Sequence, residues 1–409
     1  MMSSAYRIVT LISVAGLVAC GGQQVVEPEM GAGAGEAGQG PLGAARPKPP
    51  VVKRQAKDLF KEAMSNYRPG GGKALAKKTL RLLKEAVDED PSFGAAYLNI
   101  GRIFEAMGDW DKAADYYQQA YAKGKNFADG IANYGRILMI RGKPSQARTQ
   151  FEKALQIDEY NAEALLNLAQ DDRLRKDFDT ARKRIRKALK GNEKNPKAYA
   201  VLARVYYDMG RDDLVKLVCI TGLKIDPDYA DLNNTLGLVH LKKDDVRSAL
   251  VAFEAAAKSD PSYIPARLNI GAITFNYRDY EKSLGHFNAV VSMHPKHKVG
   301  LLSRAAALRG LKRYEEAERG YKEVLAIDST HAGAHFNLGV LYQEYESKPD
   351  LALTHFDAVL SGERQDPAMR RDVTNRIKAI RIEMQNKKEV EEMMRQQKAE
   401  EAQPETPAK

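Results

Sequence analysis

The sequence predicts an all-helical solenoid, in which pairs of antiparallel helices follow one another along the chain. The first observation is a small residue that recurs every 34 positions, eight times in one register. These residues are Gly101, Gly135, Ala169, Ala203, Gly237, Gly271, Ala305 and Gly339. The second observation is a row of large apolar residues sixteen positions later, at Tyr117, Phe151, Ile185, Cys219, Phe253, Phe287 and Tyr321. Small residues facing large ones allow neighbouring helices to interdigitate, so this pattern indicates one repeated structural unit.

Each copy is predicted to contain two helices, because its apolar residues have helical spacing in two stretches. In the first copy these residues are Tyr97, Ile100 and Phe104, then Ala113, Tyr117 and Ala120. Gly108 marks the turn between them. Several copies end in an acidic residue followed by proline, which bars its predecessor from helical geometry. These links are Asp90-Pro91, Asp226-Pro227 and Asp260-Pro261.

These positions resemble the tetratricopeptide repeat (TPR). In the fifth copy the matching residues are Leu236, Gly237, Ala249, Phe253, Ala256 and Pro261. The resemblance covers roughly residues 94–361 and implies a right-handed TPR superhelix. We expect eight regular repeats over residues 94–362, an irregular helical repeat over 51–93 and a charged capping helix over 363–402. Residues 403–409 are expected to be a disordered tail.

Two departures from the pattern lie near the ends of the array. The eighth copy carries one extra residue near Pro349, so its inter-helix turn is expected to bulge. In the capping helix, an apolar stripe should face the last repeat while the other faces meet water. The stripe is Val373, Ile377, Ile380 and Met384.

The first residues resemble a bacterial lipoprotein signal. An apolar run from Ile8 to Val18 follows Arg7, and it is too short to span a membrane. It ends in Leu-Val-Ala-Cys, which resembles the lipobox and implies that residues 1–19 are removed and that Cys20 carries acyl chains such as palmitate. Gly21 resembles the sorting pattern of the outer membrane. Residues 20–50 are rich in Gly, Ala and Pro, so we expect a mobile tether and a periplasmic, lipid-anchored solenoid.

No catalytic arrangement emerges from the sequence, and we expect neither an enzyme nor a cofactor. Cys219 stands in the large apolar row, so it is interpreted as a buried, inert thiol. His331 and His335 have the spacing of one helical face, with His294 and His297 nearby, but the pattern places no third ligand. We therefore expect no metal, although a metal-binding protein or enzyme with its site between His294 and His335 remains an alternative.

The 409-residue chain has a formal charge of +10, part of it in one basic cluster. The cluster is Arg182, Lys183, Arg184, Arg186, Lys187 and Lys190. Export would separate it from nucleic acid, so we expect no nucleic-acid partner. The cluster is either a solvated helix face or a surface for an acidic partner.

The TPR resemblance implies a concave groove lined by the first helix of each repeat. Asn recurs two positions before the small residue, where its amide could bind an extended peptide or could help to pack neighbouring repeats. One position after the small residue, Arg gives way to apolar residues halfway along the array, and Arg suits carboxylates. The candidate partner-binding residues are Asn99, Arg102, Asn133, Arg136, Asn167, Arg204, Asn269 and Asn337.

Together these features indicate a membrane-anchored scaffold or adaptor that binds envelope proteins in its groove. Lipoproteins of this plan resemble those of the myxobacterial gliding-motility machinery, so adventurous gliding motility is the leading expectation. A secretin pilotin, or another assembly factor for type IV pili, is the alternative. The sequence identifies neither the partner nor the oligomeric state.

Overall fold

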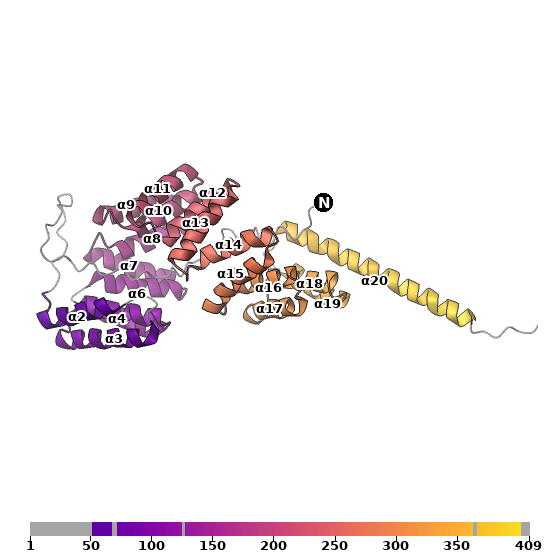
Figure 1. Ribbon diagram of the computed structural model, residues 1–409, viewed down its shortest axis with the longest axis horizontal. Coiled ribbons are helices and arrows are strands. Elements are labelled where there is room, and N and C mark those ends of the chain that lie inside the picture. Colours follow the sequence, from indigo (N-terminus) through magenta and orange to yellow (C-terminus); the bar gives the residue numbers. More distant parts are fainter. Residues whose placement is uncertain (1–50, 68–71, 125–126, 363–365, 402–409) are drawn as a thin grey trace, which may run out of the picture. The chain divides into compact units, whose positions relative to one another are not determined.

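The computed structural model describes residues 51–67, 72–124, 127–362 and 366–401. These residues form nineteen helices, α2 to α20, and contain no strand (Figure 1). They divide into two compact units, residues 51–263 and residues 264–401. The prediction of an all-helical TPR solenoid is confirmed.

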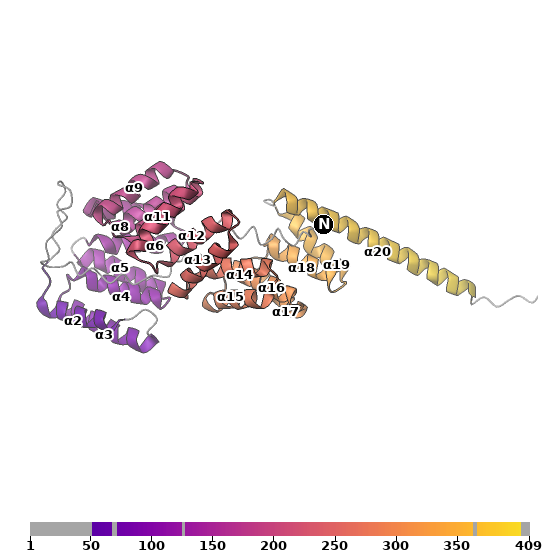
Figure 2. The ribbon, with the colours of Figure 1, turned by 45° about the horizontal axis from the view of Figure 1, so that its top comes forward.

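The first unit contains twelve helices in antiparallel pairs, as Figures 1 and 2 show. They are α2 (Arg54–Asn66), α3 (Gly72–Glu89), α4 (Gly94–Ala106), α5 (Trp110–Lys123), α6 (Ala128–Ile140), α7 (Pro144–Ile157), α8 (Ala162–Leu174), α9 (Phe178–Gly191), α10 (Pro196–Asp208), α11 (Asp212–Ile225), α12 (Ala230–Lys242) and α13 (Val246–Ser259).

The second unit contains three more pairs and a final long helix. Its helices are α14 (Ile264–Asn276), α15 (Tyr280–Met293), α16 (Lys298–Gly310), α17 (Tyr314–Ile327), α18 (Ala332–Glu344), α19 (Pro349–Ser361) and α20 (Pro367–Glu401). From α4 to α19, the first helices of the repeats have even numbers and the second helices have odd numbers. The first helices of all eight repeats begin 34 residues apart.

The small and large rows of the sequence meet inside each repeat. A Cβ atom added to Gly101 would lie 2.6 Å from Tyr117 Cε1, and one added to Gly237 would lie 2.6 Å from Phe253 Cε1. In the third repeat, Ala169 takes the place of glycine opposite the smaller Ile185, while the seventh repeat has Ala305 opposite Tyr321. The small residue therefore sets how closely the two helices of a repeat approach.

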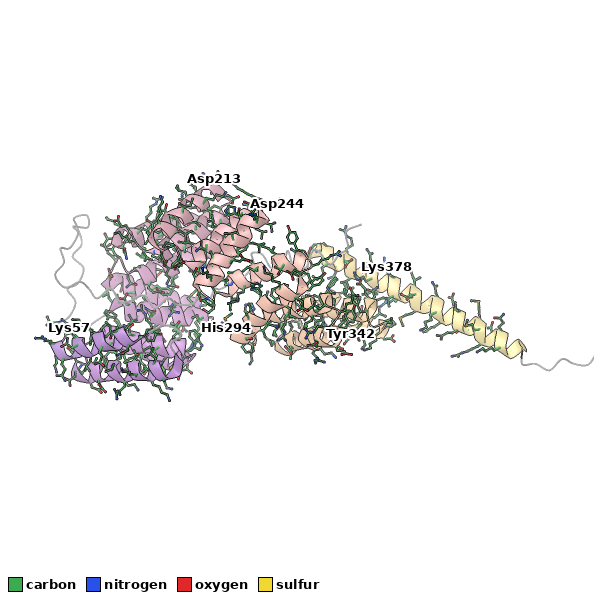
Figure 3. The ribbon with its side chains drawn as sticks, viewed as in Figure 1. Lys57, Asp213, Asp244, His294, Tyr342 and Lys378 are labelled. Carbon is green, nitrogen blue, oxygen red and sulfur yellow. The ribbon has the colours of Figure 1, made fainter. Side chains whose placement is uncertain are left out.

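The turns inside the repeats share one backbone conformation. The residue seven positions after the small one has a positive φ in the first seven repeats, whether it is Gly108 (φ 78°) or Asp244 (φ 58°, labelled in Figure 3). The N–H of the next residue donates to the carbonyl five positions earlier, as from Asp109 to Phe104 O at 2.9 Å. This hydrogen bond is that of a Schellman motif, which closes the first helix.

The expected bulge in the eighth repeat is confirmed. Its positive φ falls one residue late, at Ser347 (φ 50°). The N–H of Lys348 donates to Tyr342 O, six positions earlier, at 2.9 Å. One extra residue is therefore absorbed in the turn before α19.

The helices at the two ends of the array also follow the pattern. In α3, Leu83 and Ala86 are fully buried, as their register predicts. In α20, Val373, Ile377 and Ile380 are buried against the last repeat and Met384 packs against the same cluster. The capping role of this helix is confirmed for its first half, whereas its residues 385–398 are exposed.

The predictions for residues 1–50, 403–409 and most of the Arg68–Gly72 turn lie outside the described residues. Within the described part, no helix is both long and apolar enough to cross a membrane.

Candidate functional site

The first helices of neighbouring repeats lie in contact within each unit, so their side chains form one continuous face. In the first unit this face is crossed by a chain of charged residues, which we call the ion-pair ladder. Its members are Glu105 on α4, Arg136 on α6, Glu163 on α8 and Lys197 on α10.

Arg136 stands at the centre of the ladder. Its Nη1 donates to Glu105 Oε1 at 2.7 Å, its Nη2 donates to Glu105 Oε2, and its Nε lies 3.6 Å from Glu163 Oε1. Glu105 also accepts from the Tyr117 hydroxyl at 2.6 Å. The side chains of Arg136 and Glu105 are only 16% and 6% exposed, so removing Arg136 would leave the buried charge of Glu105 without an ion-pair partner.

The ladder favours the charged forms of Glu163 and Arg136. Burial raises the pKa of Glu163, but Lys197 Nζ, at 2.7 Å, and Arg136 outweigh it and lower that pKa to about 2. Burial alone would lower the pKa of Arg136, whereas its bonds to Glu105 raise it. The side chains of Glu163 and Lys197 remain 20% and 40% exposed, so this face carries charge that solvent can reach.

A second ion pair continues the face on the next two first helices. Arg204 on α10 donates from Nε and Nη2 to Asp231 Oδ1 on α12, at 3.1 and 2.6 Å. The Tyr263 hydroxyl donates to the same oxygen at 3.0 Å. Arg136 and Arg204 were predicted to bind carboxylates of a partner, but both already bind carboxylates of this chain. A partner's carboxylate would have to displace these internal carboxylates.

The recurring asparagines donate to their own helices. Four of them donate the side-chain N–H to the carbonyl four positions earlier, as from Asn99 to Ala95 and from Asn133 to Asp129, both at 2.8 Å. Asn167 and Asn337 do the same at 2.7 Å, and Asn269 is half-buried. Asn99, Asn133 and Asn337 are at most 4% exposed. Binding of a peptide by these amides stays a prediction, and their burial gives them a packing role as well.

Arg102 differs from the other two arginines because no ion pair holds it within the described part of the chain. It lines a small cavity of about 10 Å³ with Asn99, Met64 and Tyr67. Burial raises the pKa of Tyr67, and the charge of Arg102 partly offsets that rise. The structure thus brings Asn99 and Arg102 together, as their positions on one helix predict, with a guanidinium left for a ligand.

The basic cluster lies on α9 and is partly neutralised. Arg184 pairs with Asp172, Arg182 pairs with Asp179, and Lys187 Nζ lies 2.8 Å from Glu159. Lys183, Arg186 and Lys190 are exposed and have no ion pair among the described residues. The surface open to an acidic partner is therefore these three residues rather than six.

The histidine pair in the structure is not the one that the sequence spacing suggested. His331 caps its helix by accepting from Ala334 N at 3.2 Å, while His335 Nδ1 lies 2.9 Å from His355 Nδ1 on α19. Sequence reasoning missed His355 because only the tertiary fold brings it to His335. Among the described residues, no cluster of three or more His, Cys, Asp or Glu is placed to hold a metal ion.

Cys219 is fully buried, and burial raises the pKa of its thiol to about 12. The predicted burial of this residue in the core is confirmed, and the inertness of its thiol stays a prediction. Sequence reasoning missed Glu105, Glu163 and Asp231. These acidic residues lie on first helices, and that position was a signal that they would pair with the arginines there.

The helix pairs and their continuous first-helix face define a TPR solenoid, a class of fold that binds partner proteins. Residues 97–224 match the family model of the middle TPR-like domain of cilia and flagella-associated protein 70. No curated protein sequence matches the chain significantly.

Solved structures share the fold at low sequence identity. Human IFIT1, solved as a dimer with m7Gppp-AAAA, is 17% identical with a TM-score of 0.56, over 83% of this chain and 88% of that chain. Yeast Tom70 is 16% identical with a TM-score of 0.50, over 80% of this chain and 70% of that chain. At these identities the likeness establishes the fold alone.

Proposed function

We propose that this chain is a non-catalytic scaffold of the bacterial envelope that binds partner proteins on the first-helix face of residues 94–263. The ion-pair ladder is the observation that carries the proposal. It holds charged groups in fixed positions across four neighbouring repeats, where an extended partner would meet several of them. Positive charge for that contact comes from partly exposed Lys197 and from Arg102, which has no ion pair among the residues that the structure describes.

Anchoring is proposed from the sequence of the first residues. Cys20 would carry the acyl chains, with the solenoid on the periplasmic side of the outer membrane. Each buried methylene contributes about 0.8 kcal/mol, so several chains on one residue hold a protein firmly. Growth with labelled palmitate tests this proposal, because the label should enter the wild-type chain and not a Cys20→Ala variant. A label that persists in the variant would reject Cys20 as the acylated residue.

Within the envelope, the proposed role is adventurous gliding motility, on the resemblance described above. The test is to crosslink the full-length protein in its own host, purify it from the outer-membrane fraction and identify what accompanies it by mass spectrometry. Motility proteins of the periplasm and outer membrane would support this role. A pilus secretin would instead identify an assembly factor for type IV pili.

The binding face itself is tested by variants. Replacing Arg102 and Lys197 by Ala should remove the captured partner. Arg102→Ala alone should change the melting temperature little, whereas Lys197→Ala also takes a partner from Glu163 and should lower it. Arg186→Ala, on the exposed side of α9, is the matched control and should retain the partner. If the partner is lost only in the control, the face lies on the second helices and the proposed face is wrong.

A further inference from the structure

Arg304 stands at a helix position that is apolar or aromatic in every other repeat. The position directly precedes the small residue of the first helix. In the other repeats it holds Ile100, Tyr134, Leu168, Leu202, Leu236, Ile270 and Leu338. Ile100, Leu168 and Leu338 are at most 1% exposed, whereas the side chain of Arg304 is 22% exposed. The seventh repeat therefore lacks an apolar side chain at a position that four of the others bury, whereas Tyr134, Leu202 and Leu236 are half-buried there.

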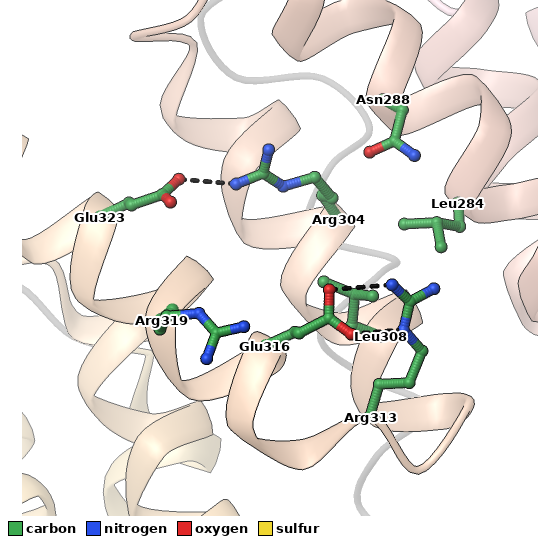
Figure 4. A pocket seen from close by; sticks show the side chains of 8 residues that line it. All are labelled: Leu284, Asn288, Arg304, Leu308, Arg313, Glu316, Arg319 and Glu323. Carbon is green, nitrogen blue, oxygen red and sulfur yellow. Dashed lines mark hydrogen bonds and ion pairs between the residues drawn. The ribbon is translucent and has the colours of Figure 1, made fainter.

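A pocket of about 330 Å³ opens at this position, between α15, α16 and α17 (Figure 4). Leu284 on α15 and Leu308 on α16 supply its apolar part, and the exposed amide of Asn288 lies beside them. Three arginines and two glutamates complete the lining. All these helices belong to the second unit, so the pocket is separate from the ion-pair ladder.

Two of the three guanidiniums are bound internally. Arg304 Nη2 donates to Glu323 Oε2 at 2.6 Å. Arg313 donates to both carboxylate oxygens of Glu316, at 2.7 and 2.8 Å, and this pair lowers the pKa of Glu316. Each of these two carboxylates thus neutralises one guanidinium.

Positive charge and hydrogen-bond donors remain after this pairing. Arg319 is exposed and has no ion pair or hydrogen bond in the described part of the chain, and Figure 4 shows its guanidinium pointing toward Glu316. The Nε of Arg304 is buried and also lacks a hydrogen-bond partner. A buried donor without an acceptor is unfavourable, so a movement of Arg304 that turned this N–H toward an acceptor of a ligand would be favourable.

We propose that this pocket binds an aspartate or glutamate side chain, flanked by aliphatic residues, in a segment of a partner protein. The proposal rests on the proposed scaffold function and adds a second docking site to it. The lining holds one guanidinium more than it has carboxylates, which a single carboxylate of a ligand would balance, and an arginine fork binds carboxylates in bidentate geometry. The two negative charges of a phosphate dianion would exceed the single excess positive charge of the lining. Leu284 and Leu308 would cover the aliphatic neighbours of the bound carboxylate.

The test uses the full chain and a blocked peptide of sequence alanine-leucine-aspartate-leucine-alanine, with asparagine in place of aspartate as its control. Methyl NMR of Leu284 and Leu308 reports occupancy. The aspartate peptide should bind about tenfold more tightly than the asparagine peptide, because charge-assisted hydrogen bonds are the stronger kind. Arg319→Gln should remove that difference, and Arg381→Gln, an exposed arginine on α20, should not.

Arg304→Leu provides a second variant, because leucine occupies this position in four other repeats. It should fold normally, fill the pocket and abolish binding of the peptide. Equal binding of the two peptides, or unchanged binding by Arg319→Gln, would overturn the proposal. Methyl shifts produced by inorganic phosphate and not by the peptide would also overturn it and point to a phosphorylated ligand. Because the peptide is tested directly, the result is independent of partner capture by Arg102 and Lys197.

Discussion

Arg136 on α6 binds Glu105 on α4 through two hydrogen bonds at a contact that is almost closed to water. The two residues are 31 positions apart and belong to neighbouring repeats. Their pairing therefore joins one repeat to the next.

Arg136→Ala should accordingly lower the free energy of unfolding by about 3 kcal/mol, because it leaves the buried charge of Glu105 without a partner. Urea denaturation measures the effect. Replacing Glu105 by Gln in the same chain should recover part of the loss, since the unpaired charge is then gone. A single variant as stable as the wild type would show that solvent compensates Glu105.

The fit between Gly237 and Phe253 gives a second prediction. Gly237→Ala should destabilise the protein by about 1–3 kcal/mol through overpacking, despite the better helix propensity of alanine. Adding Phe253→Ile should restore most of the loss, because the third repeat already pairs Ala169 with Ile185. A double-mutant cycle followed by thermal unfolding measures the coupling, and additive effects would mean that the two side chains do not clash.

The positive φ values of the turns give a third prediction. Arg278, in the turn before α15, has a φ of 63°, which glycine adopts without strain. Arg278→Gly should raise the free energy of unfolding by up to about 1 kcal/mol. Arg278→Ala keeps the Cβ atom and should bring no such gain. If both variants stabilise the protein equally, the benefit comes from losing the charged side chain and not from the backbone.

The histidine pair predicts a dependence of stability on pH. His335 Nε2 donates to Ser329 O at 3.0 Å, so in neutral His335 the Nδ1 atom accepts from His355 Nδ1. Burial and then His335 lower the pKa of His355 to about 4, from an ordinary value near 6.5. The unfolded chain therefore takes up a proton near pH 6.5 that folded His355 accepts only near pH 4. Stability present above pH 6.5 is lost as the pH falls through this window.

Because His355 is half-buried, the loss attributable to it should be about 1 kcal/mol, less than the full pKa shift implies. Thermal unfolding at pH 7 and pH 4.5 measures it. His355→Phe keeps the aromatic ring that stacks on Tyr342 and removes the titration. Its melting temperature should fall less between the two pH values, and an equal fall would place the effect on other groups.

The burial of Cys219 predicts that thiol reagents do not reach its side chain in the folded protein. Its pKa of about 12 and its complete burial leave almost no thiolate at pH 8. In a Cys20→Ala variant, where Cys219 is the remaining cysteine, a thiol reagent should label the chain in urea and not in native buffer. Rapid labelling of the native protein would mean that α11 opens readily.

The helices were predictable because their signals are local. The 34-residue period places Gly101 and its counterparts, and the spacing of apolar residues around each of them determines which helix faces are buried. The late turn at Ser347 was predictable for the same reason, since one inserted residue shifts every later position. The packing of Val373 and Ile377 likewise follows from a stripe along a single helix.

The pairings across the binding face were not predictable in the same way. Arg136 could have faced solvent or a partner on the pattern of α6 alone. Its attachment to Glu105 and Glu163 depends on how three successive first helices meet. The pairing of His335 with His355 likewise depends on the contact between two helices, and not on the regular spacing within one of them.

The turn residue Asp109 has two roles, because its N–H closes α4 and its side chain accepts from Lys112 N at the start of α5. A turn built in this way has a fixed length, and the same length recurs through the first seven repeats. Duplication or loss of a whole 34-residue block would leave each remaining turn intact, whereas smaller changes would need a local repair such as that before α19. The array can therefore lengthen or shorten in steps of one whole repeat. Engineered versions should be cut at the boundaries between repeats.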